Sequence, residues 1–131
     1  MKIKLYLDTS IPSSYFDYSK PLRQLITQKW FENDAFIYEL FISVITIEEI
    51  EKLENLNKKD EIRNLILNHK MNVLEISTKA IDLANEYIKN GTIPKSEPED
   101  AYHIAIATIN NIDTLASWNF KLIVSINPIR F

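Results

Sequence analysis

The sequence predicts an α/β domain with a central parallel sheet of about four to five strands and helices on both faces. Short apolar runs of strand length alternate along the chain with longer segments of helical spacing. The chain has 131 residues and shows neither an internal repeat nor a linker of biased composition. This length suits one hydrophobic core. We therefore predict a single domain over residues 1–131.

The first third of the chain reads as a strand followed by a helix. Residues 2–7 alternate charged and apolar side chains and then become apolar, which predicts a strand that ends at Asp8, with Pro12, Ser13 and Ser14 breaking it. Residues 21–33 predict an amphipathic helix that begins at Pro21. Its apolar residues at helical spacing are Leu22, Leu25, Ile26, Trp30 and Phe31.

The middle of the chain continues the alternation. An apolar run over residues 38–44 predicts the second strand, and the spacing of apolar residues then predicts a helix from about Thr46. Residues 61–69 predict a helix and residues 71–76 a third strand. A further helix over residues 77–90 has Ser77 or Thr78 as a cap and stops before Gly91.

The last third begins with a helix signal and ends with short strands. Ser96 and Glu99 have the spacing of a capping box, with Pro98 in the first turn, which predicts a mostly buried helix from about there to Asn110. Short strands are predicted over residues 114–117 and 122–125.

Composition narrows the chemistry. The chain has no cysteine, so a metal ion would be held by oxygen or imidazole ligands. The formal net charge of −3 argues against a protein that simply coats nucleic acid. No apolar run approaches the roughly 18 residues of a membrane span, and no secretion signal is evident, so we expect no membrane contact and a cytoplasmic location. The single glycine excludes glycine-rich nucleotide-binding loops.

Two carboxylates are predicted where parallel strands end, which is where α/β sheets bind ligands. Asp8 directly follows the first strand, and Glu48 and Glu49 open the helix after the second. At about 100° per residue, the apolar face of this helix is centred roughly 100° from Glu49 but roughly 160° from Glu48. Glu49 is therefore the better candidate to face a cleft.

The third carboxylate is Asp100, in the first turn of the buried helix, where the helix dipole also favours an acid. Asp113 precedes a predicted strand and should lie at the opposite edge of the sheet, whereas Ser117 and Asn119 follow that strand. Three converging carboxylates would repel one another without cations. Asp8, Glu49 and Asp100 therefore predict binding of Mg²⁺ or Mn²⁺, and such ions support hydrolysis of a phosphodiester.

Three ordered motifs resemble the PIN-domain family, in particular the VapC-like toxin ribonucleases of toxin–antitoxin pairs. The motifs are Tyr6-Leu7-Asp8-Thr9-Ser10, then residues 43–50, then residues 98–105, and the match spans nearly the whole chain. The family's acidic residues carry over onto Asp8, Glu49 and Asp100. The resemblance implies a metal-dependent endoribonuclease acting on RNA, an antitoxin partner that blocks the cleft, and a homodimer.

The fourth motif of the family departs here. Asn119 stands where a carboxylate is expected, so one metal position is firmer than a second. Asn119 can still offer a carbonyl oxygen to a metal or orient a bound water. Thr9 and Ser117 are candidate supporting residues. A catalytically weak or inactive PIN-like domain that binds RNA or a protein remains the alternative.

Other readings of single residues stay open. His103 is more simply a hydrogen-bonded structural histidine than a metal ligand. Trp118 could stack on an RNA base, although packing near the sheet edge is the simpler role. A phosphoacceptor receiver domain has a similar sheet, but it needs an aspartate after the third strand, where this chain has Ser77.

Overall fold

The computed structural model describes residues 2–119 of the chain. A four-stranded parallel sheet with the order β3-β2-β1-β4 forms its centre. The strands are β1 (Ile3–Leu7), β2 (Tyr38–Ser43), β3 (Asn72–Leu74) and β4 (Thr114–Ala116). The predicted parallel sheet is confirmed, while the strand predicted over residues 122–125 lies outside the described residues.

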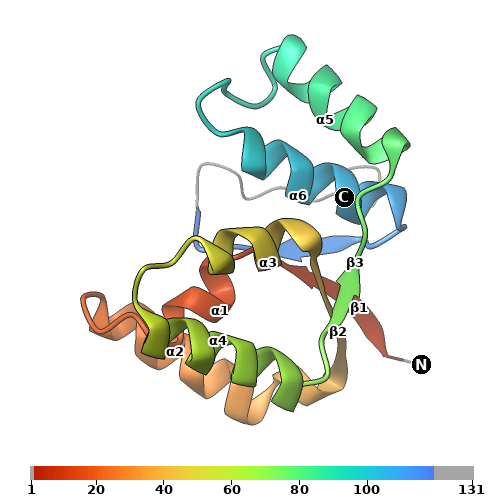
Figure 1. Cartoon of the computed structure of the whole chain (residues 1–131). Coiled ribbons are helices and arrows are strands. Elements are labelled where there is room, and N and C mark those ends of the chain that lie inside the picture. The colour runs from red at the N-terminus through yellow and green to blue at the C-terminus, as the bar shows by residue number, and fades with distance from the viewer. Residues whose placement is uncertain (1, 120–131) are drawn as a thin grey trace.

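Helices cover both faces of the sheet, as predicted (Figure 1). In chain order the helices are α1 (Ser10–Ser14), α2 (Pro21–Asn33), the 3-10 turn η1 (Ala35–Ile37), α3 (Val44–Glu51), α4 (Leu56–Asn68), α5 (Thr78–Lys89) and α6 (Pro98–Ile109). Figure 1 shows α1, α2 and α4 on one side of the sheet and α5 and α6 on the other. None of the helices in the described part of the chain is long and apolar enough to cross a membrane.

Alternation along the two central strands divides the core into two layers. Leu5, Leu7 and Ile42 point into a cluster that holds Ile50 of α3 and Ile62 of α4. Tyr6 and Phe41 point the other way, into a cluster with the alanines of α5 and α6. Successive strand residues face opposite sides, so β1 is buried on both faces, and its end at Asp8 lies where the two layers meet.

Local capping explains several helix ends. Ser43 accepts a hydrogen bond from Ile45 N at the start of α3, and Ser77 accepts one from Ala80 N at the start of α5, as predicted from its cap position. Gly91 has a φ of 74° just after α5, a left-handed conformation that glycine adopts without strain. The prediction that this helix stops before Gly91 is therefore confirmed.

Several predicted elements differ from the structure, including β3, which was predicted over residues 71–76 and spans Asn72–Leu74. Residues 10–14 form the short helix α1, where Pro12 lies in a first turn and needs no backbone N–H. Helix α4 begins at Leu56, earlier than predicted, because Asn55 caps it through Lys58 N. The capping box predicted at Ser96 is wrong, since Glu97 is the N-cap of α6 and makes no side-chain capping hydrogen bond.

Helix α2 has the predicted bounds but does not bury the predicted face. Phe31 packs in the core, whereas Leu22, Leu25 and Ile26 are 71%, 51% and 47% exposed. The buried positions of this helix include the polar Gln24, whose amide donates to Tyr15 O. The face of α2 that is turned inward therefore differs from the one that its apolar spacing predicts.

Candidate functional site

Asp8 is held by serines at the carboxyl end of β1. Its side chain is 7% exposed, and Oδ1 accepts hydrogen bonds from Ser10 N at 3.0 Å and from Ser10 Oγ. Ser117, which follows β4, donates its hydroxyl to the other oxygen, Oδ2. The backbone N–H of Asp8 donates to Ala116 O, so β1 and β4 meet beside the carboxylate. These contacts fix the orientation of the Asp8 carboxylate.

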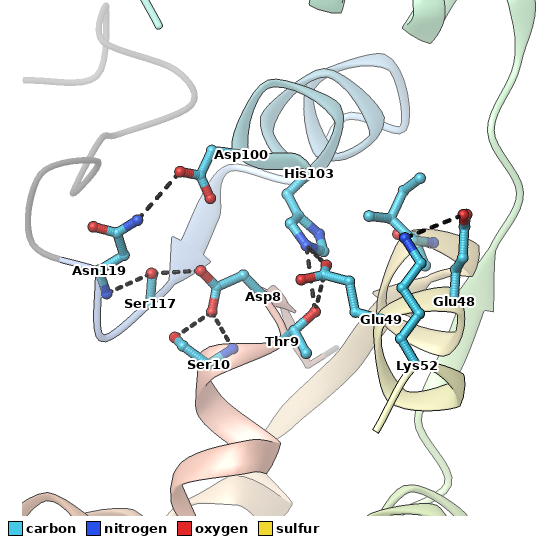
Figure 2. Close-up of polar contacts among 12 residues, drawn as sticks. Asp8, Thr9, Ser10, Glu48, Glu49, Lys52, Asp100, His103, Ser117 and Asn119 are labelled. Atoms are coloured by element: carbon cyan, nitrogen blue, oxygen red, sulfur yellow. Dashed lines mark hydrogen bonds and ion pairs between the residues drawn. The ribbon is translucent and has the colours of Figure 1, made fainter. Parts of the chain in front are cut away.

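Glu49 projects from α3 toward the same edge. Its Oε1 accepts hydrogen bonds from Thr9 Oγ1 and from His103 Nε2, each at 2.8 Å (Figure 2). Burial raises the pKa of Glu49, but the hydrogen bond and charge of His103, with the bond from Thr9, outweigh it and hold the pKa below its usual range. Its neighbour Glu48 points into solvent instead and lies 3.8 Å from Lys52 Nζ in an exposed ion pair.

Asp100 lies in the first turn of α6 and approaches the two other carboxylates. Burial, and then the negative charges of Glu97, Asp8 and Glu49, raise its pKa from 3.8 to about 6, against an opposing effect of His103. Asn119 donates its amide to Asp100 Oδ2 at 3.2 Å. Burial is the largest cause and neighbouring negative charge comes after it, and a bound cation would favour the ionised form of Asp100 against both.

One small cavity lies between Asp8 and Asp100. Asp8, Asp100, His103 and Ser117 line it, and its volume of about 10 Å³ holds about one water molecule. Figure 2 shows the side chains of Asp100 and Asn119 on the same side of Asp8 as Ser117. Hydrogen bonds link Glu49 and Thr9 to His103, and Asn119 to Asp100, so the predicted site residues lie at one edge of the sheet.

A family model decides which fold family this arrangement represents. The model for the PIN domain matches residues 5–121, which is most of the chain. The chain belongs to the PIN-domain family. The motifs that hold Asp8, Glu49 and Asp100 all fall inside the matched range, so the resemblance drawn from the sequence is confirmed at the level of the family.

Solved structures with the same fold support the assignment. A crystal structure of VapBC2 from Rickettsia felis bound to a promoter DNA fragment contains a chain with 18% identity and a TM-score of 0.61, covering 91% of this chain and 90% of that one. The FitAcB structure from Neisseria gonorrhoeae gives 18% identity and a TM-score of 0.55, covering 84% of each chain. A search of the curated proteins finds no match.

The PIN site gathers oxygen donors from β1, α3 and α6, which suits hard divalent cations. Asp8, Glu49 and Asp100 would hold the cation, with the amide carbonyl of Asn119 beside them. Within residues 2–119, no three histidine or acidic side chains are already drawn together as a closed ligand set. The donor chemistry fits Mg²⁺ or Mn²⁺, and the carboxylates would have to draw inward around it.

The structure shows His103 hydrogen-bonded, as the sequence predicted, but its partner Glu49 in this PIN site was not predicted. The ring is 4% exposed and bonds to Glu49, so His103 contacts a predicted ligand and is more than a packing residue. Its Nδ1 lies 2.6 Å from Tyr6 Oη. The available signal was spacing, since His103 follows Asp100 by three residues on one helix, and Tyr6 of β1 precedes Asp8 by two residues.

Trp118 and Asp113, which the sequence analysis also considered, take the positions expected for residues outside the PIN site. Trp118 packs against the core layer of α2 and donates its indole N–H to Thr27 Oγ1 at 2.9 Å, while Arg23 lies over its ring. These contacts favour a packing role over base stacking. Asp113 precedes β4, at the edge of the sheet opposite Asp8.

Proposed function

We propose that this PIN domain is a metal-dependent endoribonuclease that hydrolyses RNA phosphodiester bonds with Mg²⁺ or Mn²⁺ held by Asp8, Glu49 and Asp100. The observation that carries the proposal is how the carboxylate oxygens are used. Both hydrogen bonds to Glu49 end on Oε1, and the bond from Asn119 to Asp100 ends on Oδ2. Within residues 2–119, Glu49 Oε2 and Asp100 Oδ1 accept no such bond, which leaves one oxygen of each for a cation.

The protein supplies placement and charge. Divalent ions activate water for attack at neutral pH and neutralise the charge that develops on the phosphodiester. Ser10 and Ser117 keep Asp8 in one orientation, and Thr9 and His103 do the same for Glu49. Because no side-chain nucleophile is required, the residues of the chain act by holding ions and orienting the substrate.

We further propose that the protein is the toxin of a cytoplasmic toxin–antitoxin pair and works as a homodimer. The structural relatives come from the assemblies named VapBC2 and FitAcB. An antitoxin that covers Asp8, Glu49 and Asp100 would block the nuclease, and loss of the antitoxin would restore the activity. Purification of the protein from its native host, followed by size-exclusion chromatography, tests both the partner and the dimer.

The decisive test uses the two adjacent glutamates. Glu49→Gln removes a proposed ligand, and Glu48→Gln removes the same charge from an exposed position on the same helix. Structured and single-stranded RNAs are incubated with each variant in Mg²⁺, Mn²⁺ or EDTA, with Asp8→Asn and Asp100→Asn alongside. We expect wild type and Glu48→Gln to cut, and the other three variants, and all samples in EDTA, to lose at least a hundredfold in rate.

One observation favours a second function. Asn119 stands where the family pattern expects a carboxylate, so the site has one negative charge fewer for a second cation. A PIN domain that binds RNA or a protein partner without cutting would show Mn²⁺ binding that Asp8→Asn abolishes, together with no cleavage of any RNA by the folded, partner-free wild type. That pair of results would replace the nuclease proposal.

A further inference from the structure

A buried chain of hydrogen bonds runs behind Glu49 through the molecule. Ser43 Oγ lies 2.7 Å from Tyr6 Oη, which lies 2.6 Å from His103 Nδ1, and His103 Nε2 lies 2.8 Å from Glu49 Oε1. These residues come from β1, the β2–α3 junction, α3 and α6, and both Tyr6 and Ser43 are fully buried. This series of hydrogen bonds therefore connects Glu49 to both central strands and to the helix that carries Asp100.

The direction of each hydrogen bond in this series follows from which groups can donate. An ionised carboxylate only accepts, so the Nε2 atom that faces Glu49 must carry a hydrogen. If the imidazole is neutral, Nδ1 then has a lone pair, and the Tyr6 hydroxyl donates to it while Ser43 donates to Tyr6. If the imidazole is charged, Nδ1 donates to Tyr6, which donates to Ser43. In either order, Nε2–H points at Glu49.

Tyr6 is suited to hold the ring in this way. Burial, which outweighs its hydrogen bonds with the hydroxyls beside it, raises the pKa of Tyr6 far above its usual value, so Tyr6 keeps its proton. The rings of Tyr6 and His103 also meet edge to face with centroids 5.6 Å apart. The histidine is therefore fixed both by packing and by a bond at the nitrogen that does not face Glu49.

We propose that His103 is a positioning residue, anchored by Tyr6, that orients Glu49 so that Oε1 is occupied and Oε2 is presented to the cation. This inference rests on the proposed metal-dependent function and extends it to residues that would not touch the metal. Hydrogen-bonding partners behind ligating groups typically change metal affinity by about 10- to 100-fold when they are removed. Without this bond, Oε1 keeps only the hydrogen bond from Thr9, so the Glu49 carboxylate is held less firmly in one orientation.

The test measures Mn²⁺ affinity by isothermal titration calorimetry on the metal-free full chain, so it does not depend on cleavage. His103→Leu removes the donor at similar volume, His103→Gln keeps an N–H that can reach Glu49, and Tyr6→Phe removes only the hydroxyl that anchors the ring. We expect the Kd for Mn²⁺ to rise about 10- to 100-fold in His103→Leu and severalfold in Tyr6→Phe. His103→Gln should recover most of the loss, which a purely structural role would not produce.

Controls separate this inference from the proposed function and from simple destabilisation. Ile62→Val trims a fully buried side chain in the other core layer and should leave the Kd unchanged. Asp8→Asn should abolish binding; if it binds Mn²⁺ like wild type, the proposed metal site itself is wrong. If Asp8→Asn loses binding while His103→Leu and Tyr6→Phe stay within twofold of wild type, only the positioning role is refuted. Should His103→Leu fail to fold, Tyr6→Phe and His103→Gln decide the question.

Discussion

Two serines make the same pair of bonds to an aspartate two residues earlier, one at the site and one in solvent. Ser10 donates its N–H to Asp8 Oδ1 at 3.0 Å, and its hydroxyl donates to the same oxygen. Ser19 donates to Asp17 Oδ1 in the same two ways, with an N–H distance of 3.1 Å, but on an exposed turn. Replacing each serine with alanine therefore removes the same bond in two environments.

The expected magnitudes differ because of burial. In Ser10→Ala, Asp8 loses a hydrogen bond to a buried charge, worth about 1.5–3 kcal/mol, and Trp118 N, which donates to Ser10 Oγ at 2.8 Å, loses its acceptor. Together these losses should lower the free energy of unfolding by about 2–4 kcal/mol. Water replaces the lost bond in Ser19→Ala, so the change should stay within about 0.5 kcal/mol.

Thermal unfolding of the metal-free protein, followed by circular dichroism, measures the difference. At about 3 °C per kcal/mol for a chain of this size, Ser10→Ala should lower the Tm by roughly 6–12 °C and Ser19→Ala by less than about 2 °C. Equal shifts in the two variants would refute the claim that the serines hold a buried carboxylate at the end of β1.

Three other predictions follow from the site. Asn119→Asp places a carboxylate beside Asp100, so it should lower the Tm of the metal-free protein and raise its Mn²⁺ affinity at least severalfold. Unchanged or weaker Mn²⁺ binding, measured by calorimetry, would count against a cation beside Asp100. The raised pKa of Asp100, about 6 in the folded chain against 3.8 ordinarily, means that its contribution to stability is present below about pH 4 and is lost as pH rises through about 6. Denaturant unfolding from pH 4 to 7 should show this loss in metal-free wild type but not in Asp100→Asn, and Mg²⁺ should offset it above pH 6. Trp118→Phe removes the hydrogen bond to Thr27 and should lower stability by about 1–2 kcal/mol with little change in RNA binding, whereas a large loss of RNA affinity at full stability would favour base stacking.

Local signals carried much of the fold. The strand before Asp8, the bounds of α2 and the Ser77 cap of α5 depend on neighbouring residues, so alternation, spacing and capping chemistry predict them. The start of α4 was missed although Asn55 offered a cap, because the apolar spacing in that helix begins later. The residues of α1 read as a break because Pro12 and the serines are common both in turns and in first helical turns.

The site was harder to predict in full. Strand ends and helical phase were enough to select Asp8 and to prefer Glu49 over Glu48, because both arguments use only local geometry. The bonds among Tyr6, His103 and Glu49 join residues 54 and 97 positions apart in sequence, and no local pattern encodes such pairings. The apolar spacing of α2 likewise did not reveal that Thr27 is buried and bonds to Trp118, 91 positions away.

The residues that bond at the site lie far apart in the sequence, and this separation affects when a newly made chain can complete the site. Ser117 bonds to Asp8 across 109 positions, and Trp118 bonds to Ser10 across 108. Such long-range contacts close late in folding, because each requires a large loop to be ordered first. A nascent chain exposes Asp8 and Glu49 early but cannot complete their surroundings until α6 and β4 have emerged. Synthesis therefore proceeds with the surroundings of Asp8 and Glu49 unassembled until α6 and β4 have been made.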